Sequence, residues 1–155
     1  MATEVKTQVK VSHGVEPFWK ALAMDYMLVI PQIIPNLVKN AEFIEGDGGL
    51  GTVILFTFGP NVPAMKYQKE KIVELDATLH RIAMEVVEGG HLNLGFSSYK
   101  TTFQLTALGE QETLVDLTVT YESEIDQESS MPSKTTASAL TYVKCLENYL
   151  SNPVV

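Results

Sequence analysis

The sequence predicts an α+β domain in which a curved, seven-stranded antiparallel sheet grips one long C-terminal helix, with two short helices after the first strand. Two observations support this class. Segments of strand period alternate with turn signals through the middle of the chain, and an amphipathic segment of helical period follows them as the last element. Because one helix need not fill a strongly curved sheet, we expect a cavity between them.

Length and composition indicate a single domain over residues 1–155, with 45% apolar residues to form a core. The net charge of −8 argues against nucleic-acid binding, which needs a basic face. Cys145 is the single cysteine, so no internal disulfide forms, as is usual in a reducing compartment. With neither a signal peptide nor a membrane-length apolar run, we expect a cytoplasmic protein with access to the nucleus. We expect it to be a monomer or weak dimer that binds no membrane.

The first elements are a strand and two short helices. Polar and apolar residues alternate over Glu4–Val11, which is typical of a half-buried strand. Ser12 is a candidate N-cap for a helix that tolerates Pro17 in its first turn. A second short helix is expected within Asp25–Ile33, where Pro31 limits its length.

Six further strands follow, each bounded by glycine, proline or a polar turn. They are expected at Val38–Ile44, Thr52–Phe58, Tyr67–Leu75, His80–Val87, Phe96–Leu105 and Thr113–Tyr121. In the last strand the odd-numbered residues from Val115 to Tyr121 are apolar and share one face. Asp76-Ala77-Thr78 reads as a turn, and Gly89-Gly90 marks a turn or bulge.

A long helix is expected from about Ser133 to Leu150, after a polar loop over residues 122–132. Pro153 lies just beyond its end. Its apolar residues recur at helical spacing and predict a stripe that faces the sheet. The stripe consists of Ala139, Tyr142, Val143, Leu146, Tyr149 and Leu150.

The glycines at 46, 48 and 51 spell G-x-G-x-x-G, the dinucleotide fingerprint, but their context argues against a nucleotide site. The fingerprint requires a helix after the loop, whereas Val53–Phe58 is rich in β-branched and aromatic residues and reads as a strand. The loop is therefore interpreted as a glycine-rich β-hairpin.

Metal and hydrolase motifs are absent from the sequence. His13, His80 and His91 have no metal-ligand spacing, and Cys145 has no partner cysteine. No G-x-S-x-G elbow is present. We therefore expect neither a metal nor a cofactor.

Polar residues in the segment 67–75 are the candidate chemistry of the interior. Gln68 and Glu70 share a face with Ile72, while Lys69 and Lys71 lie on the other. Lysines tolerate water, which favours turning Gln68 and Glu70 toward the helix. The alternative is a solvated edge strand of mixed charge, and the pattern does not decide between the two.

The neighbouring strands would complete the lining of an apolar cavity that contains a few polar groups. His80 and Val86 are expected on this interior face as well. A solid core is the alternative, although the tyrosines, the methionine and the threonine make a looser core than packing alone prefers. The candidate ligand-binding residues are Gln68, Glu70, Ile82, Met84, Tyr99, Thr101, Phe103, Ala139, Tyr142 and Val143.

The whole chain resembles the plant pathogenesis-related class 10 proteins, the birch-pollen-allergen family. The residues that carry the resemblance are Ile44–Thr52 and Val87-Glu88-Gly89-Gly90, together with the order of the elements. The resemblance implies a helix-grip fold, with a seven-stranded sheet holding the C-terminal helix around a hydrophobic cavity.

Within that family the chain looks similar to the cytokinin-specific and other phytohormone-binding proteins. The matching stretches are Val29-Ile30-Pro31, Glu88-Gly89-Gly90, Ser98–Phe103 and Leu146–Asn152. The resemblance implies that the residues at Gln68, Glu70 and Tyr142 bind the polar atoms of a hormone.

The norcoclaurine and norbelladine synthases are a second similar branch, through Tyr67–Lys71 and His91–Phe96. Those enzymes use a lysine and an acid to condense an amine with an aldehyde, and Glu70 matches the acid. Ile82 stands at the lysine position, Asn93 at the aspartate position and Gln68 at the tyrosine position. Because Ile82 cannot transfer a proton, we expect no such catalysis.

The sequence therefore predicts an intracellular carrier or sequestering protein for a small plant hormone. A cytokinin ranks first among the ligands, followed by gibberellin, abscisic acid and melatonin-like compounds. The alternatives are a condensing enzyme and a broad defence-type binder of flavonoid-like or other apolar molecules.

Overall fold

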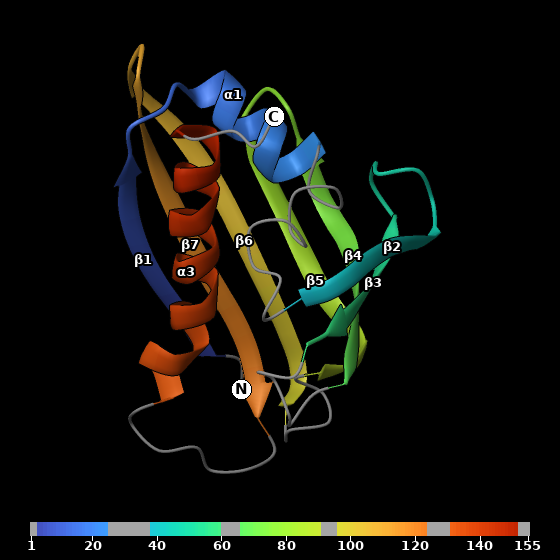
Figure 1. Ribbon diagram of the computed structural model, residues 1–155. Coiled ribbons are helices and arrows are strands. Elements are labelled where there is room, and N and C mark those ends of the chain that lie inside the picture. The colour runs from blue at the N-terminus through green and yellow to red at the C-terminus, as the bar shows by residue number, and fades with distance from the viewer. Residues whose placement is uncertain (1–2, 25–37, 60–65, 91–95, 124–130, 152–155) are drawn as a thin grey trace.

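The computed structural model describes residues 3–24, 38–59, 66–90, 96–123 and 131–151. Seven strands and a long C-terminal helix make up most of this part of the chain (Figure 1). The elements are β1 (Thr3–Val11), α1 (Val15–Trp19), a π-helical turn (Lys20–Met24), β2 (Val38–Glu45), β3 (Val53–Phe58), β4 (Tyr67–Asp76), β5 (Arg81–Gly89), β6 (Phe96–Gly109), β7 (Glu112–Ser123) and α3 (Met131–Ser151).

The strands form one antiparallel sheet in the order β1-β7-β6-β5-β4-β3-β2. Every pair except β1–β7 joins strands that are consecutive in sequence, as in an antiparallel meander. The sheet curves around α3, so that β1 and β2 end on opposite sides of the helix (Figure 1). The expected fold class is confirmed.

Side-chain alternation along β7 defines the two faces of the sheet. Val115, Leu117 and Val119 are fully buried and Tyr121 is 6% exposed, whereas the even-numbered residues between them are only half-buried. The odd-numbered residues therefore face α3, and the polar residues face the outside of the sheet.

The apolar stripe of α3 covers the inner face of the sheet. Tyr142, Val143 and Leu146 are buried in the core, and Ala139, Tyr149 and Leu150 pack against it in partly buried positions. Burying a large apolar side chain stabilises a fold by roughly 1.5–3 kcal/mol. Packing on the sheet therefore holds the helix in place.

The glycine-rich segment is a β-hairpin, as its sequence context predicts. Gly46, Gly48 and Gly51 have φ values of +83°, +109° and +87°, and β3 begins directly after the loop. The Gly48 amide donates to the Thr52 hydroxyl at 2.9 Å, which closes the loop internally. No helix N-terminus follows to receive a pyrophosphate.

The prediction that Ser12 caps α1 is wrong. Gly14 is the N-cap, without a side-chain hydrogen bond, and a Cβ there would lie 2.6 Å from the Glu110 carbonyl oxygen. Ser12 instead donates its amide to a Glu147 carboxylate oxygen at 2.7 Å, which ties this loop to α3. Pro17 does lie in the first turn, and the helix expected within Asp25–Ile33 falls outside the described residues.

If packing on the sheet holds α3, Leu146→Ala should lower the free energy of unfolding by about 2–5 kcal/mol, because it removes a fully buried side chain from the core. Chemical denaturation measures this. Lys144→Ala, at an exposed position of the same helix, is the control and should change stability by less than about 0.5 kcal/mol. Equal losses in the two variants would contradict this account of α3.

Candidate ligand-binding site

Gln68 and Glu70 of β4 face inward, and the alternative of a solvated edge strand is wrong. β4 lies inside the sheet, where Glu70 pairs with Ile54 of β3 and with Val86 of β5. These two neighbours are 1% and 4% exposed, and Gln68 is 6% exposed. The side chain of Glu70 therefore projects from the inner face between buried apolar residues.

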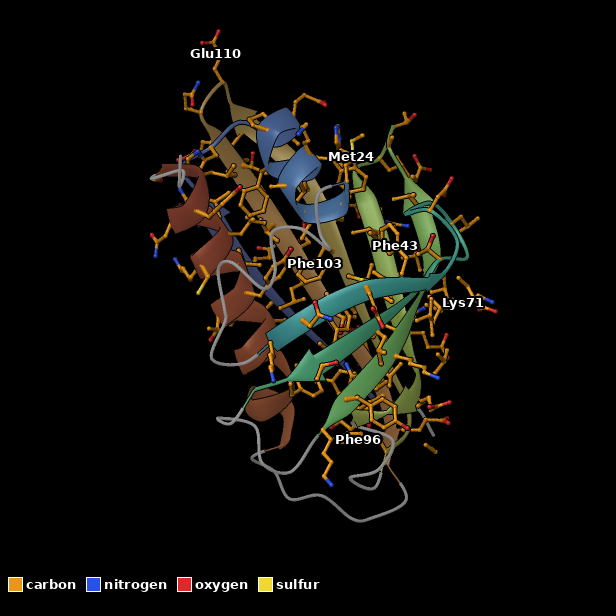
Figure 2. All side chains as sticks on the ribbon, turned by 45° about the vertical axis from the view of Figure 1, so that its right-hand side comes forward. Met24, Phe43, Lys71, Phe96, Phe103 and Glu110 are labelled. Atoms are coloured by element: carbon orange, nitrogen blue, oxygen red, sulfur yellow. The ribbon has the colours of Figure 1, made fainter. Side chains whose placement is uncertain are left out.

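The opposite face of β4 carries the lysines, as expected. The Lys69 ammonium lies 3.2 Å from a Glu88 carboxylate oxygen, and the Tyr67 hydroxyl donates to the same carboxylate at 2.9 Å. Lys71 is exposed on the outside of the sheet (Figure 2). The Lys69 ammonium and the Glu88 carboxylate thus lie outside the interior that Glu70 faces.

Strands β5 and β6 contribute apolar side chains to the inner face, which would form the walls of a ligand site. Ile82 pairs with Phe103 and Met84 with Thr101, so all four residues share the inner face. Ile82, Met84 and Phe103 are at most 3% exposed. Figure 2 shows Phe103 between the strands and α3, where its ring centroid lies 6.2 Å from that of Tyr142.

All ten predicted residues therefore belong to the inner face of the sheet or to the inward side of α3. The two aliphatic residues from the helix are Ala139, which is partly buried, and Val143, which is fully buried. Tyr99 lies in a separate hydrophobic cluster with Val86 and Tyr121. The structure thus brings the predicted set together around one interior, across two packing clusters.

His80 does not line the interior, contrary to expectation. It precedes β5 in a turn, with φ at +53°. Its Nε2 lies 2.8 Å from a Glu16 carboxylate oxygen, and its ring meets Trp19 edge-on at 5.5 Å. The tight turn breaks the alternation that would have placed it with the inward residues of β5.

Phe96 is an inward residue that the sequence pattern missed. It packs edge-on against Tyr99 and Tyr121, with ring centroids 5.3 and 5.5 Å away. Strict alternation from Tyr99 would have turned Ser97 inward, but the pairing with β7 shifts register between Phe96 and Ser98. Aromatic character was the one sequence signal for this position.

Two inward polar side chains keep accessible surface. Glu70 and Thr101 are half-buried, although their neighbours in the sheet on the same face are fully buried. Thr101, for example, lies between Met84 and Val119, which are 2% and 0% exposed. Both residues thus keep some accessible surface among the buried neighbours of the inner face.

The environment of Glu70 disfavours its charge. The residue as a whole is half-buried, but its carboxyl group is enclosed by protein. This burial raises the pKa of the Glu70 carboxyl to about 7. A hydrogen bond from Gln68 partly opposes the rise. Near neutral pH the interior therefore holds a carboxyl group that can be ionised or protonated.

The Glu70 carboxylate also affects the pKa of two tyrosines. Burial raises the pKa of Tyr99 and of Tyr142 well above the ordinary value, and the Glu70 charge raises both further. Both phenols therefore stay protonated and can donate hydrogen bonds. Gln68, Glu70, Tyr99 and Tyr142 form a polar set that suits a mostly apolar ligand with a few donors and acceptors.

A groove of about 710 Å³ lies on the other, outer face of the sheet. Gln8 donates to Asp116 at 2.6 Å, and Arg81 donates to Gln104 at 2.7 Å and to Glu74 at 3.5 Å. Because these polar groups already satisfy one another, we place no ligand site there.

The described ranges show neither a metal site nor a membrane-spanning helix. They contain no group of three or more histidine, cysteine or acidic side chains arranged to hold a metal ion. None of their helices combines the length and apolar character needed to cross a membrane. His91 and Asn93 fall outside these ranges.

Comparisons with known proteins agree with this fold. The profile of the Pathogenesis-related protein Bet v 1 family matches residues 1–153. Norbelladine synthase from Narcissus pseudonarcissus is 32% identical over 129 residues, covering 83% of this chain and 78% of that protein. Dau c 1 isoallergen Dau c 1.0401 from Daucus carota subsp. sativus is 33% identical over 124 residues, covering 78% and 79%.

Solved structures show the same architecture at lower identity. Norcoclaurine synthase from Thalictrum flavum, in complex with dopamine and hydroxybenzaldehyde, has a TM-score of 0.83 and 21% identity, covering all of this chain and 90% of that one. Ara h 8.0201 has a TM-score of 0.84 and 20% identity, covering 98% and 100%. These similarities show the fold.

The raised pKa of Glu70 predicts a pH-dependent stability. Between pH 4.5 and 7 the folded state keeps a proton that the unfolded state has lost, so the free energy of unfolding falls as pH rises through this range. Glu70→Gln removes this loss and should be more stable than the wild type by roughly 1–3 kcal/mol at pH 8, with little difference at pH 4. Denaturation at both pH values measures it.

Glu42→Gln, at an exposed position of β2, is the matched control and should show no such dependence on pH. A stability difference for Glu70→Gln that is the same at pH 4 and pH 8 would contradict the burial of this carboxylate.

Proposed function

Since the chain belongs to the Pathogenesis-related protein Bet v 1 family, whose members bind apolar ligands, we propose that it is an intracellular binding protein for a small plant hormone, with a cytokinin as the first candidate. The observation that carries this proposal is the inward-facing Glu70 carboxyl beside Gln68, within apolar walls. Gibberellin, abscisic acid and melatonin-like compounds follow as ligand classes.

The chemistry of a cytokinin suits this polar set. An N6-substituted adenine offers N–H donors to a carboxylate, and its ring nitrogens can accept from an amide or a phenol. Glu70 supplies the acceptor, while Gln68 and Tyr142 supply donors from β4 and α3. The flat ring and the largely hydrocarbon N6 substituent match the apolar side chains of Ile82, Met84 and Phe103.

Zeatin should bind with micromolar affinity or better, which corresponds to about −8 kcal/mol. Calorimetric titration of a panel of hormones and aromatic metabolites measures this. Absence of heat with every cytokinin at high concentration would remove cytokinins from the proposal, and the remaining ligands of the panel would then identify the class.

Glu70→Gln should weaken zeatin binding roughly ten- to a hundredfold, because it removes a hydrogen bond to a charged group while preserving shape. Lys69→Gln is the matched control from the outer face of the same strand and should leave affinity nearly unchanged, because Lys69 pairs with Glu88. A loss of affinity in the control and not in Glu70→Gln would show that the site is not on this face.

A condensing enzyme is the second candidate, because norbelladine synthase is 32% identical to this chain. Ile82 argues against it: it is 1% exposed and faces the interior, where the resemblance expects the catalytic lysine. An alkyl side chain has no proton to transfer. Glu70 would have to act without this partner.

We therefore expect no condensation of dopamine with a hydroxyphenylacetaldehyde beyond the uncatalysed rate. Chiral chromatography of the product measures it. An enantiomeric excess well above that of buffer alone would contradict the expectation and show that another group replaces the lysine.

A broad defence-type binder of flavonoid-like or other apolar ligands is the third candidate. Such binding would rest on the apolar walls and not on Glu70. In the calorimetric panel it would appear as similar affinities for many ligands, all unaffected by Glu70→Gln.

A further inference from the structure

Two glycines at the end of β5 lie against the strand that carries Gln68. Gly89 and Gly90 have φ values of +73° and +50°. A Cβ on Gly89 would lie 2.8 Å from the Tyr67 carbonyl oxygen. A Cβ on Gly90 would lie 2.8 Å from the Gln68 Cβ and 2.6 Å from its Cδ, and it would overlap Oε1. The backbone of Gly90 is thus packed directly against the Gln68 amide.

Backbone conformation alone does not explain a glycine at position 90. His80 has φ at +53°, nearly the value of Gly90, and it carries a full side chain. Residues other than glycine do enter this left-handed region at a modest cost. The close approach of Gln68, by contrast, means that any side chain at position 90 would displace the glutamine side chain.

The contact leads from Gly90 to the carboxyl group of the site. The Gln68 side chain is 6% exposed, and it hydrogen-bonds to Glu70 on the same face of β4. A glutamine side chain loses considerable rotational freedom on burial, so its amide stays in one place only where its surroundings fix it. Gly90 on one side and Glu70 on the other provide such surroundings.

We propose that Gly90 is a positioning residue of the ligand site, because its bare backbone holds the Gln68 amide against Glu70 and so fixes the donor and acceptor pattern that a ligand meets. This inference rests on the proposed function for its effect on binding. Its effect on the Gln68–Glu70 pair is independent of any ligand.

Gly90→Ala tests it. The added methyl should displace the Gln68 amide and break its hydrogen bond to Glu70. In the wild type this hydrogen bond lowers the Glu70 pKa. The Glu70 pKa, followed by NMR of its carboxyl carbon, should therefore rise. Zeatin affinity should fall about tenfold, as for the loss of one hydrogen bond.

Gly51→Ala is the matched control, because Gly51 has φ at +87° and a Cβ there would meet nothing within 4 Å. It introduces backbone strain without the contact and should leave both readouts unchanged. In a Gln68→Gly background, which lacks the contacting side chain, Gly90→Ala should have no further effect on the Glu70 pKa.

The proposal is overturned if Gly90→Ala leaves the Glu70 pKa unchanged, or if Gly51→Ala shifts it equally. If Gly90→Ala does not fold, the Gln68→Gly/Gly90→Ala variant decides, since its folding supports the contact and its failure to fold contradicts it. If wild type does not bind zeatin, the cytokinin proposal fails, while the Glu70 pKa still decides the role of Gly90.

Discussion

The register of β4 within the sheet is the constraint on which the candidate site depends. Side chains alternate along a strand, so a slip of one residue would turn Lys69 and Lys71 inward and Glu70 outward. Pairing with β3 on one side and β5 on the other prevents such a slip, and the shift of register near Glu70 is absorbed at the end of β5. The fold thus places a carboxyl group where apolar packing alone would exclude one.

The inward carboxyl group sets the chemistry of the interior. A few neighbouring residues then determine whether it serves binding or proton transfer. A carboxyl with a pKa of about 7 suits either hydrogen bonding to a ligand or proton transfer. A lysine at position 82 would add a second proton-transferring group, whereas Ile82 adds only apolar surface. The family thus includes an enzyme, norbelladine synthase, while this chain carries an apolar side chain at position 82.

Alternation and helical period predicted most of the framework. The inward residues of β7, the stripe of α3 and the glycine hairpin follow from local patterns and are confirmed. Errors arose where tertiary contacts override such patterns. Ser12 bonds to Glu147 far along the chain, and a bulge turns Phe96 inward. The sequence does not determine which face of β4 points inward, because both faces carry charged residues. Only the pairing with strands on both sides decides it.

The central claim is that Glu70 accepts a hydrogen bond from the ligand as a carboxylate. Proton release on binding is its most direct test. Zeatin titrations at pH 6 in buffers of different ionisation enthalpy measure this release. With a pKa of about 7, Glu70 is mostly protonated at this pH in the free protein, so binding should release close to one proton per ligand, and Glu70→Gln should abolish the release. Tight binding of zeatin without proton release would contradict the account.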